Sequence, residues 1–257
     1  MRSSYHAIYL SPHFDDAVLS CGGQIAAHAR NGEAVLIVTL TAGEPDGPLS
    51  TMARDLHKGW NRQDLIPARR EEDRQACTRL GAEWLHVAVP DGIYRRHPDT
   101  GEPLYPTLRH LFGAAHPSDP AARDWAEALR ELPPAGMVLA PLGAGGHADH
   151  RLVRHAAEAV FGQSLWYYED FPYSKRLGAV QRLTWPPWRW RSRTTRIAPD
   201  DLKARCEASA VYSSQIETLA GGSGEFIRKT ERYVRRIGGE RIWQKRQTCR
   251  NRLSKSA

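Results

Sequence analysis

The sequence lacks several features that would assign it to a specialised class of protein. Its longest apolar runs, such as residues 34–40, are far too short to span a bilayer. Its N-terminus has no basic segment followed by an apolar stretch and a small-residue cleavage site, so we expect no secretory signal and a cytoplasmic location. The GxGxxG pattern of dinucleotide-binding enzymes is also absent after the first strand-like run.

Cysteine is scarce, and its spacing excludes two common sites. The four cysteines are scattered at positions 21, 77, 206 and 249, and no two of them form a CxxC pair. Neither a zinc knuckle nor a dithiol redox motif is therefore indicated. We expect free thiols in packed helices.

The composition is that of an ordinary globular protein, but the charge is unevenly distributed. Of the 257 residues, 41% are apolar and 25% are charged, which suits one sizeable core. Residues 174–257 hold 20 Lys and Arg against 7 Asp and Glu, whereas residues 1–173 hold 16 against 22. Such a basic region is either a solvated, arginine-rich surface or an attractor for phosphorylated or lipid-linked molecules, including an anionic membrane surface.

Short β-like runs alternate with helical stretches over the first two-thirds of the chain. The predicted strands span residues 5–10, 34–40, 84–89, 137–140 and 165–168, and the predicted helices span residues 17–30, 69–80, 121–132 and 147–161. This alternation favours parallel strands joined by right-handed crossovers. We expect a single domain over residues 1–257, with an open, doubly wound, mostly parallel α/β sheet (Rossmann-like) in residues 1–173 and the basic part, residues 174–257, packed on it.

Two long connections and the C-terminal part are harder to interpret. Residues 43–67 and 92–119 exceed the usual crossover loop, and such insertions often carry function. The Trp-, Pro- and Arg-rich segment 184–193 is compatible with an extended arm, a sheet edge or an aromatic recognition patch. Residues 200–253 are predicted to be helical, with a Gly-rich break at residues 221–224.

The residues that carry chemistry follow two of the predicted strands. HFDD at residues 13–16 comes after the first strand, and HADH at residues 147–150 comes after the fourth. Each motif places imidazoles and carboxylates on a tight turn that enters a helix, and both turns face the same edge of the sheet. One such motif alone is often only a helix cap. The coincidence of the two indicates a shared catalytic site.

Two imidazoles and one carboxylate, with an open position for water, form a typical catalytic zinc site. His13, Asp16 and His150 fit the ligand roles. Because the metal lowers the pKa of a bound water, a carboxylate that is not a ligand is then needed to take the proton. Asp15 fits that role, and His147 remains for the reacting carbonyl.

These motifs resemble those of the LmbE-like, or PIG-L, family of zinc-dependent N-deacetylases, over about residues 7–215. The family's (P/A)HPDD signature is similar to PHFDD at residues 12–16, where Phe14 replaces the usual Pro, and its HxDH motif is matched at residues 147–150. The resemblance implies an LmbE-type fold and hydrolysis of the N-acetyl group of an N-acetylglucosaminyl-type conjugate. The expected partner is thus a small-molecule or lipid-linked amino-sugar conjugate, and no nucleic acid is expected; homo-oligomerisation stays open.

The resemblance also implies roles for the motif residues. Zn²⁺, or another divalent metal such as Fe²⁺, would be bound by His13, Asp16 and His150, with Asp15 as the general base. His147 would stabilise the oxyanion or protonate the leaving amine. Asp149, also in the HxDH motif, would orient or tune His147.

Weaker matches suggest residues that contact the substrate. Glu44 ends a Thr-rich segment similar to one in the family, Arg69 lies in an RxxE-like helix, and Asp91 precedes Gly92 after the third strand. By that resemblance, these three residues are candidates for substrate binding. Gly145 stands where some relatives carry Tyr, so any tyrosine at the oxyanion site must come from elsewhere.

Three alternatives remain at this stage. A metal-dependent amidase or esterase acting on a non-sugar substrate would keep the metal and release a different acyl product. A non-catalytic sugar- or lipid-binding module on the same fold would not need the spare base Asp15. A nucleic-acid site in the basic part would bind independently of zinc and weaken steeply with salt.

Overall fold

The computed structural model describes residues 1–60 and 65–246. Their seven strands form one sheet, in the order β3-β2-β1-β4-β5-β7-β6. The strands are β1 (Tyr5–Ser11), β2 (Val35–Thr39), β3 (Glu83–His86), β4 (Ala135–Pro141), β5 (Trp166–Tyr168), β6 (Trp190–Thr195) and β7 (Glu240–Lys245). The first five pair in parallel, whereas β7 is antiparallel to both of its neighbours, β5 and β6. The mostly parallel sheet predicted for residues 1–173 is confirmed.

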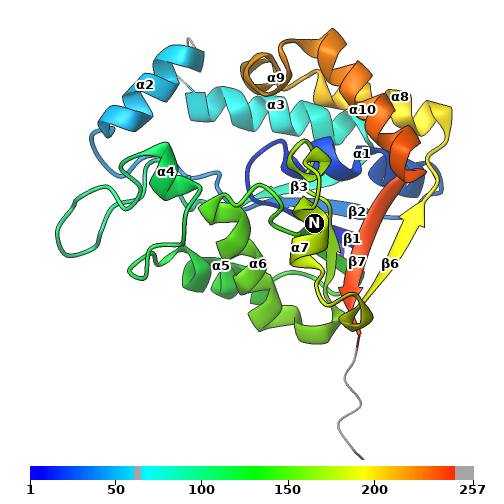
Figure 1. Ribbon diagram of the computed structural model, residues 1–257, viewed down its shortest axis with the longest axis horizontal. Coiled ribbons are helices and arrows are strands. Elements are labelled where there is room, and N and C mark those ends of the chain that lie inside the picture. The colour runs from blue at the N-terminus through cyan, green and yellow to red at the C-terminus, as the bar shows by residue number, and fades with distance from the viewer. Residues whose placement is uncertain (61–64, 247–257) are drawn as a thin grey trace, which may run out of the picture.

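Helices cover both faces of the sheet, as a doubly wound fold requires (Figure 1). The alternating side chains of β1 separate two cores, since Ala7 and Tyr9 face one and Ile8 and Leu10 face the other. The first core is covered by α1 (Asp16–Arg30), α3 (Leu65–Arg79), α8 (Pro199–Ser209), α9 (Ser213–Ala220) and α10 (Ser223–Ile237). The second core is covered by α5 (Ala121–Arg130) and α6 (Ala148–Phe161).

The C-terminal part departs from the helical prediction at one element. Residues 240–245 form β7, a strand that lies between β5 and the edge strand β6, where we expected helix. Gly238 and Gly239 end α10 with positive φ angles of 80° and 147°, which only glycine adopts readily. Burial then alternates along β7, a pattern that suits a strand. The predicted break at residues 221–224 is confirmed by Gly221, whose left-handed conformation ends α9, and the predicted residues 247–253 lie outside the described chain.

The long connections contain short helices and approach the carboxyl end of the sheet. The first holds α2 (Thr51–Trp60), and the second holds α4 (Leu108–Leu111). In the segment after β5, α7 (Ala179–Leu183) precedes β6, so that the Trp- and Arg-rich segment provides an edge strand. Cys21, Cys77 and Cys206 are buried free thiols in α1, α3 and α8, as predicted, and Cys249 lies outside the described residues. Within the described chain, every helix is too short or too polar to cross a membrane.

A half-buried carboxylate links β7 to the helical layer. Glu158 of α6 accepts hydrogen bonds from Arg154, Tyr167 and Lys245, each at 2.9 Å. Burial alone would raise the pKa of Glu158, but the hydrogen bonds from Lys245 and Arg154 outweigh it and lower the pKa to about 2. Because the folded-state pKa lies below the unfolded value, this stabilisation is present above about pH 4.5 and is lost as the pH falls toward 2.

We expect Glu158→Gln to reduce the free energy of unfolding by about 1 kcal/mol at pH 7 and by much less at pH 3. Urea denaturation at both pH values measures the difference. Glu131→Gln, at an exposed position just after α5, is the matched control and should be neutral at both. An equal loss for Glu158→Gln at the two pH values would contradict an ionic role.

Candidate metal centre and active site

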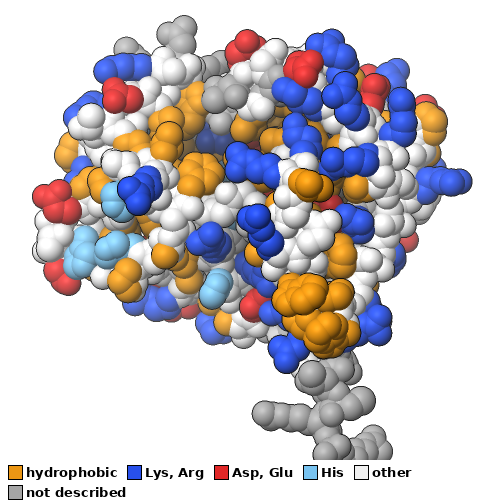
Figure 2. All heavy atoms as spheres, viewed as in Figure 1, with side chains coloured by type: hydrophobic (Ala, Val, Ile, Leu, Met, Phe, Trp, Pro, Cys, Tyr) orange, Lys and Arg blue, Asp and Glu red, His pale blue; other side chains and the backbone are white. Residues whose placement is uncertain are grey.

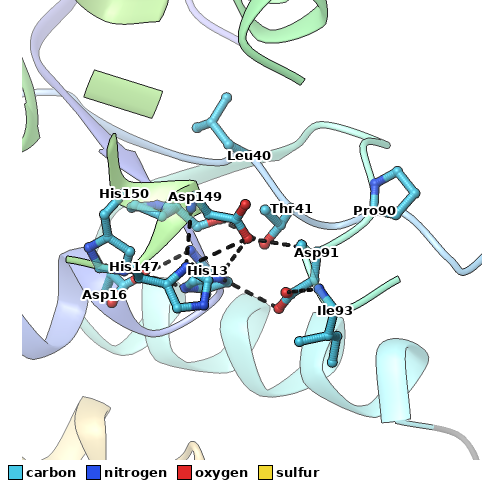
Figure 3. A network of polar contacts seen from close by, with 12 residues as sticks. His13, Asp16, Leu40, Thr41, Pro90, Asp91, Ile93, His147, Asp149 and His150 are labelled. Carbon is cyan, nitrogen blue, oxygen red and sulfur yellow. Dashed lines mark hydrogen bonds and ion pairs between the residues drawn. The ribbon is translucent and has the colours of Figure 1, made fainter. Parts of the chain in front are cut away.

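Two strand-to-helix turns bring the predicted chemistry to one place. The turn from β1 to α1 carries His13, Asp15 and Asp16, and the start of α6 after β4 carries His147 and His150. Because β1 and β4 are parallel neighbours, their carboxyl ends lie side by side at the point where the strand order reverses. Figure 3 shows the two imidazole groups of α6 facing His13 and Asp16 across this edge.

Three donor atoms converge on this edge. The Asp16 Oδ2 atom lies 3.0 Å from His13 Nδ1 and 3.2 Å from His150 Nε2. Ligand atoms of these three residues all lie within 4.8 Å of one another, so one ion can reach all three. The structure therefore brings together the three residues predicted as ligands, and Asp15 is outside this group.

Each imidazole of the group is held through its other nitrogen by a carboxylate. His13 Nε2 lies 3.1 Å from Asp149 Oδ2, and His150 Nδ1 lies 2.6 Å from Asp170 Oδ1. The second oxygen of Asp170 accepts the backbone N–H groups of Gly143 and Ala144. Carboxylates in this position fix the tautomer and orientation of ligating histidines. The donor set thus fits a divalent cation, with a two-His, one-carboxylate pattern that both zinc and Fe²⁺ accept.

Asp16 carries the charge that a carboxylate ligand needs, whereas His150 must release a proton when a metal binds. Burial alone would raise the pKa of Asp16, but the neighbouring His150 and His13 hold that pKa well below its usual value. Burial alone would lower the pKa of His150, but Asp16 and then Asp170 raise it to about 10. Asp16 is therefore an anion at neutral pH, as a carboxylate ligand must be.

Two further groups have donors within reach of one another and fit a cation less well. The first joins His13 and Asp149 to Asp91 and His147. In it, the Asp149 carboxylate already accepts hydrogen bonds from the Arg95 guanidinium at 2.5 Å and the Gly92 N–H at 3.0 Å. A metal cation bound there would be repelled by the positive charge of that guanidinium. The second group consists of His6, His28 and Glu33 at partly exposed positions, and its residues do not line the cavity described below.

Asp15 is placed as a base rather than as a ligand. Its buried carboxylate makes no side-chain hydrogen bond with the described residues, and its nearest cation is Arg69, at 3.7 Å between Asp15 Oδ1 and Nη2. Burial, and then the charge of Asp16, raise the pKa of Asp15 to about 6. A carboxylate with such a pKa can accept a proton from water and release it again near neutral pH.

His147 is a neutral hydrogen-bond donor in this arrangement. Its Nδ1 accepts the backbone N–H of Asp149 at 3.1 Å, so its proton resides on Nε2. Burial, and then the charge of His13, lower the pKa of His147 to about 3. A neutral imidazole suits stabilisation of an oxyanion better than protonation of an amine. The Asp149 side chain, which we expected to orient or tune His147, binds His13 and Arg95, and its Oδ2 is 4.0 Å from His147 Nδ1. Its charge opposes the lowering of the His147 pKa.

A cavity of about 210 Å³ opens beside these residues. Arg69 and Asp91 line it, as expected for substrate contacts, together with His13, Asp15 and His147. Its remaining walls are mostly apolar and come from α2, α4, α9 and the segment after β5: Leu56, Trp60, Leu108, Leu111, Phe112, Phe171 and Leu219. Glu44 is exposed and bound by Arg70 at 3.1 Å, and it is not among the described lining residues.

Tyr173 is a wall residue for which the motifs gave no role. Its ring lies against Gly145, where a Cβ atom would come within 2.7 Å of Tyr173 Cγ. The ring centroid is 6.1 Å from that of His150. Gly145 therefore makes room for a tyrosine from a distant segment of the chain. The sequence offered one hint, the glycine at a position where some relatives carry Tyr.

Comparisons with known proteins agree with this geometry. The family described as GlcNAc-PI de-N-acetylase (PIG-L) matches residues 8–161. The chain is 30% identical over 245 residues to a 2'-N-acetylparomamine deacetylase of Streptomyces fradiae, with 92% of this chain and 80% of that protein covered. It is 25% identical to a 1D-myo-inositol 2-acetamido-2-deoxy-alpha-D-glucopyranoside deacetylase of Corynebacterium glutamicum, over 84% and 73% of the two chains. The zinc-inhibited form of a teicoplanin deacetylase superposes with a TM-score of 0.78 at 26% identity, covering 95% of this chain and 99% of that one.

Proposed function

The chain belongs to the PIG-L family, whose description is GlcNAc-PI de-N-acetylase, and on that premise we propose that it hydrolyses the N-acetyl group of an amino-sugar conjugate with the help of a divalent metal, zinc in the first place. One observation carries the proposal. His13 Nδ1, Asp16 Oδ2 and His150 Nε2 converge while the carboxylate of Asp15 stays unligated beside them. A binding module has no need of that spare base.

The metal would be held by His13, Asp16 and His150. When bound, a divalent cation lowers the pKa of water and polarises a carbonyl group. The protein's own contribution is the fixed orientation of the two rings, through Asp149 and Asp170.

The remaining steps fall to two side chains of the cavity. Asp15 removes a proton from the attacking water as the oxygen bonds to the acetyl carbon, and its raised pKa lets it pass that proton to the departing amine. His147 donates its Nε2–H to the carbonyl oxygen as negative charge develops there. The C–N bond then breaks, giving acetate and the free amino sugar.

The cavity lining suggests how a conjugate is held. Arg69 and Asp91 offer a cation and an anion next to the reacting group, where sugar hydroxyls need hydrogen-bond partners. Leu108 and Phe112 are 51% and 40% exposed at α4 and just after it, so the outer part of a conjugate meets apolar walls. Glu44 stays a substrate-binding prediction without support from the cavity.

The decisive test combines metal analysis with an acetate assay. Purified protein should bind about one divalent ion per chain and release acetate from N-acetylglucosaminides after loading with zinc or Fe²⁺. Chelation should abolish release, and reloading should restore it. Metal-dependent turnover of generic acyl esters or amides, with none of N-acetyl sugars, would favour an amidase or esterase instead. Sugar binding without turnover would favour a binding module.

We expect Asp170→Asn to weaken metal affinity by about 10- to 100-fold while the protein stays folded. The amide keeps an oxygen for the Gly143 and Ala144 N–H groups but removes the charge that faces His150 Nδ1. Titration against a chelating indicator measures the affinity. Asp200→Asn, an exposed aspartate in α8, serves as the control, and equal affinity in both variants would refute a role for Asp170.

A further inference from the structure

A long stretch of the chain carries only positive charges. Between Asp170 and Asp200 there is no acidic residue, whereas the stretch contains Lys175 and six arginines at positions 176, 182, 189, 191, 193 and 196. None of the six arginines forms an ion pair with any described residue. Arg191 and Arg193 lie over the Trp166 ring, and Arg191 also bonds to Gln244. The excess charge of this stretch is therefore left to solvent or to a partner.

The same stretch exposes large apolar side chains. Leu177 is 99% exposed, and Trp185 and Trp188 are 71% and 69% exposed. The two indole rings contact each other, with centroids 6.1 Å apart and an interplanar angle of 60°. Figure 2 shows a hydrophobic group below the α7 region, with Lys and Arg side chains around it. Scattered apolar residues are ordinary on a surface, but an exposed pair of tryptophans among unpaired arginines is not.

The segment that carries these side chains is anchored to the sheet where it enters β6. Trp190, at the start of β6, is buried against the Tyr167 ring at a centroid distance of 5.4 Å. Arg154 and Lys245 lie over those same two rings. The exposed residues thus lie on α7 and the segments around it, which lead into the edge strand β6, and the first residue of β6 is anchored on its inner side.

We propose that this Trp–Arg surface, defined by Leu177, Arg182, Trp185, Trp188 and Arg189, docks on an anionic lipid bilayer. Tryptophan favours the headgroup level of a membrane, and each Lys or Arg near an anionic bilayer contributes favourably. Leu177 favours a bilayer over a nucleic acid as the partner. An aliphatic side chain is stabilised by insertion between acyl chains, but it can neither stack on a base nor form hydrogen bonds with one. The tilted indole pair likewise offers no flat platform for successive bases.

Docking in this way would bring the cavity close to the membrane. Tyr173 lines the cavity, and Leu177 follows it by four residues in the chain. Further cations lie on α10 next to this segment, where Arg232 and Arg236 surround a hollow shared with Lys175. The inference does not depend on the proposed reaction, and its test needs no turnover.

The test is co-sedimentation of the full chain with vesicles of phosphatidylcholine alone or mixed with phosphatidylglycerol. We expect binding to the mixed vesicles only, and weaker binding at high salt. Arg182→Gln combined with Arg189→Gln should weaken it by about 25-fold, at roughly fivefold per charge. Trp185→Ser combined with Trp188→Ser should weaken it by at least about tenfold.

Trp84→Ser is the matched control, because Trp84 is an exposed tryptophan on β3, at the opposite edge of the sheet. It should bind like the unaltered chain, and unchanged thermal unfolding of each variant shows that it is folded. Failure of the unaltered chain to bind the anionic vesicles would overturn the proposal. Equal vesicle binding by the control and the tryptophan double variant would also overturn it. So would binding of the unaltered chain to single-stranded DNA, if the arginine double variant lost that binding but still bound the anionic vesicles.

Discussion

Asp15→Asn should retain its metal and release acetate at a rate about 10²- to 10⁴-fold lower than the unaltered enzyme. The amide has nearly the shape of the carboxylate but cannot accept the proton of the attacking water. Asp15 lies outside the group of converging ligand atoms, and Arg69 is its only ion-pair partner among the described residues, so the substitution leaves His13, Asp16 and His150 in place. Steady-state acetate release and metal content per chain, measured on the same sample, test both halves of the expectation.

The pH profile sharpens this test. Because burial raises the pKa of Asp15 to about 6, and the base works only when deprotonated, activity should rise with pH through that region in the unaltered enzyme. The residual activity of Asp15→Asn should lack that rise. Asp46→Asn, at an exposed position in the loop after β2, should behave like the unaltered enzyme. If Asp15→Asn lost its metal together with its activity, Asp15 would be a ligand and not the base.

The core of the fold and the main site followed from local signals in the sequence. The β-branched run at residues 34–40 and the motifs at residues 13–16 and 147–150 each report on their own surroundings: a buried strand, or a polar turn entering a helix. Parallel pairing of β1 with β4 then places both turns at one edge. Site residues that lie between the end of a strand and the start of the next helix can thus be predicted from the sequence.

Residues that complete the site across distant segments were not readable in this way. Asp170 and Arg95 support His150 and Asp149 from other loops, and nothing in their immediate sequence indicates those contacts. Tyr173 reaches the cavity because Gly145 leaves it space, a relation between two positions that neither shows alone. β7 was missed because helical charge patterning continues almost to the glycines that end α10.

The strand order explains why the site lies where it does. The sheet runs outward from β1 to β2 and β3 on one side and from β4 to β5 on the other, so the crossovers from β1 and β4 leave in opposite directions. A crevice forms between them at the carboxyl ends of the strands. The antiparallel pair β7 and β6 extends the far edge and carries the Trp–Arg surface beside it without altering that crevice.

His150→Ala should lower metal affinity by at least about 100-fold and abolish acetate release with it, since an imidazole ligand contributes more than the carboxylate that orients it. Because Asp16 would lose one buried partner, His150→Gln provides a second variant that keeps a hydrogen-bonding side chain at the same place. His155→Ala, on the exposed side of the same helix, controls for effects on α6. Metal content after dialysis separates the variants. If His150→Ala or His150→Gln kept a full complement of tightly bound metal, His150 would not be a ligand. The metal site would then be the neighbouring group around Asp91 and His147, which the nearby charge of Arg95 disfavours.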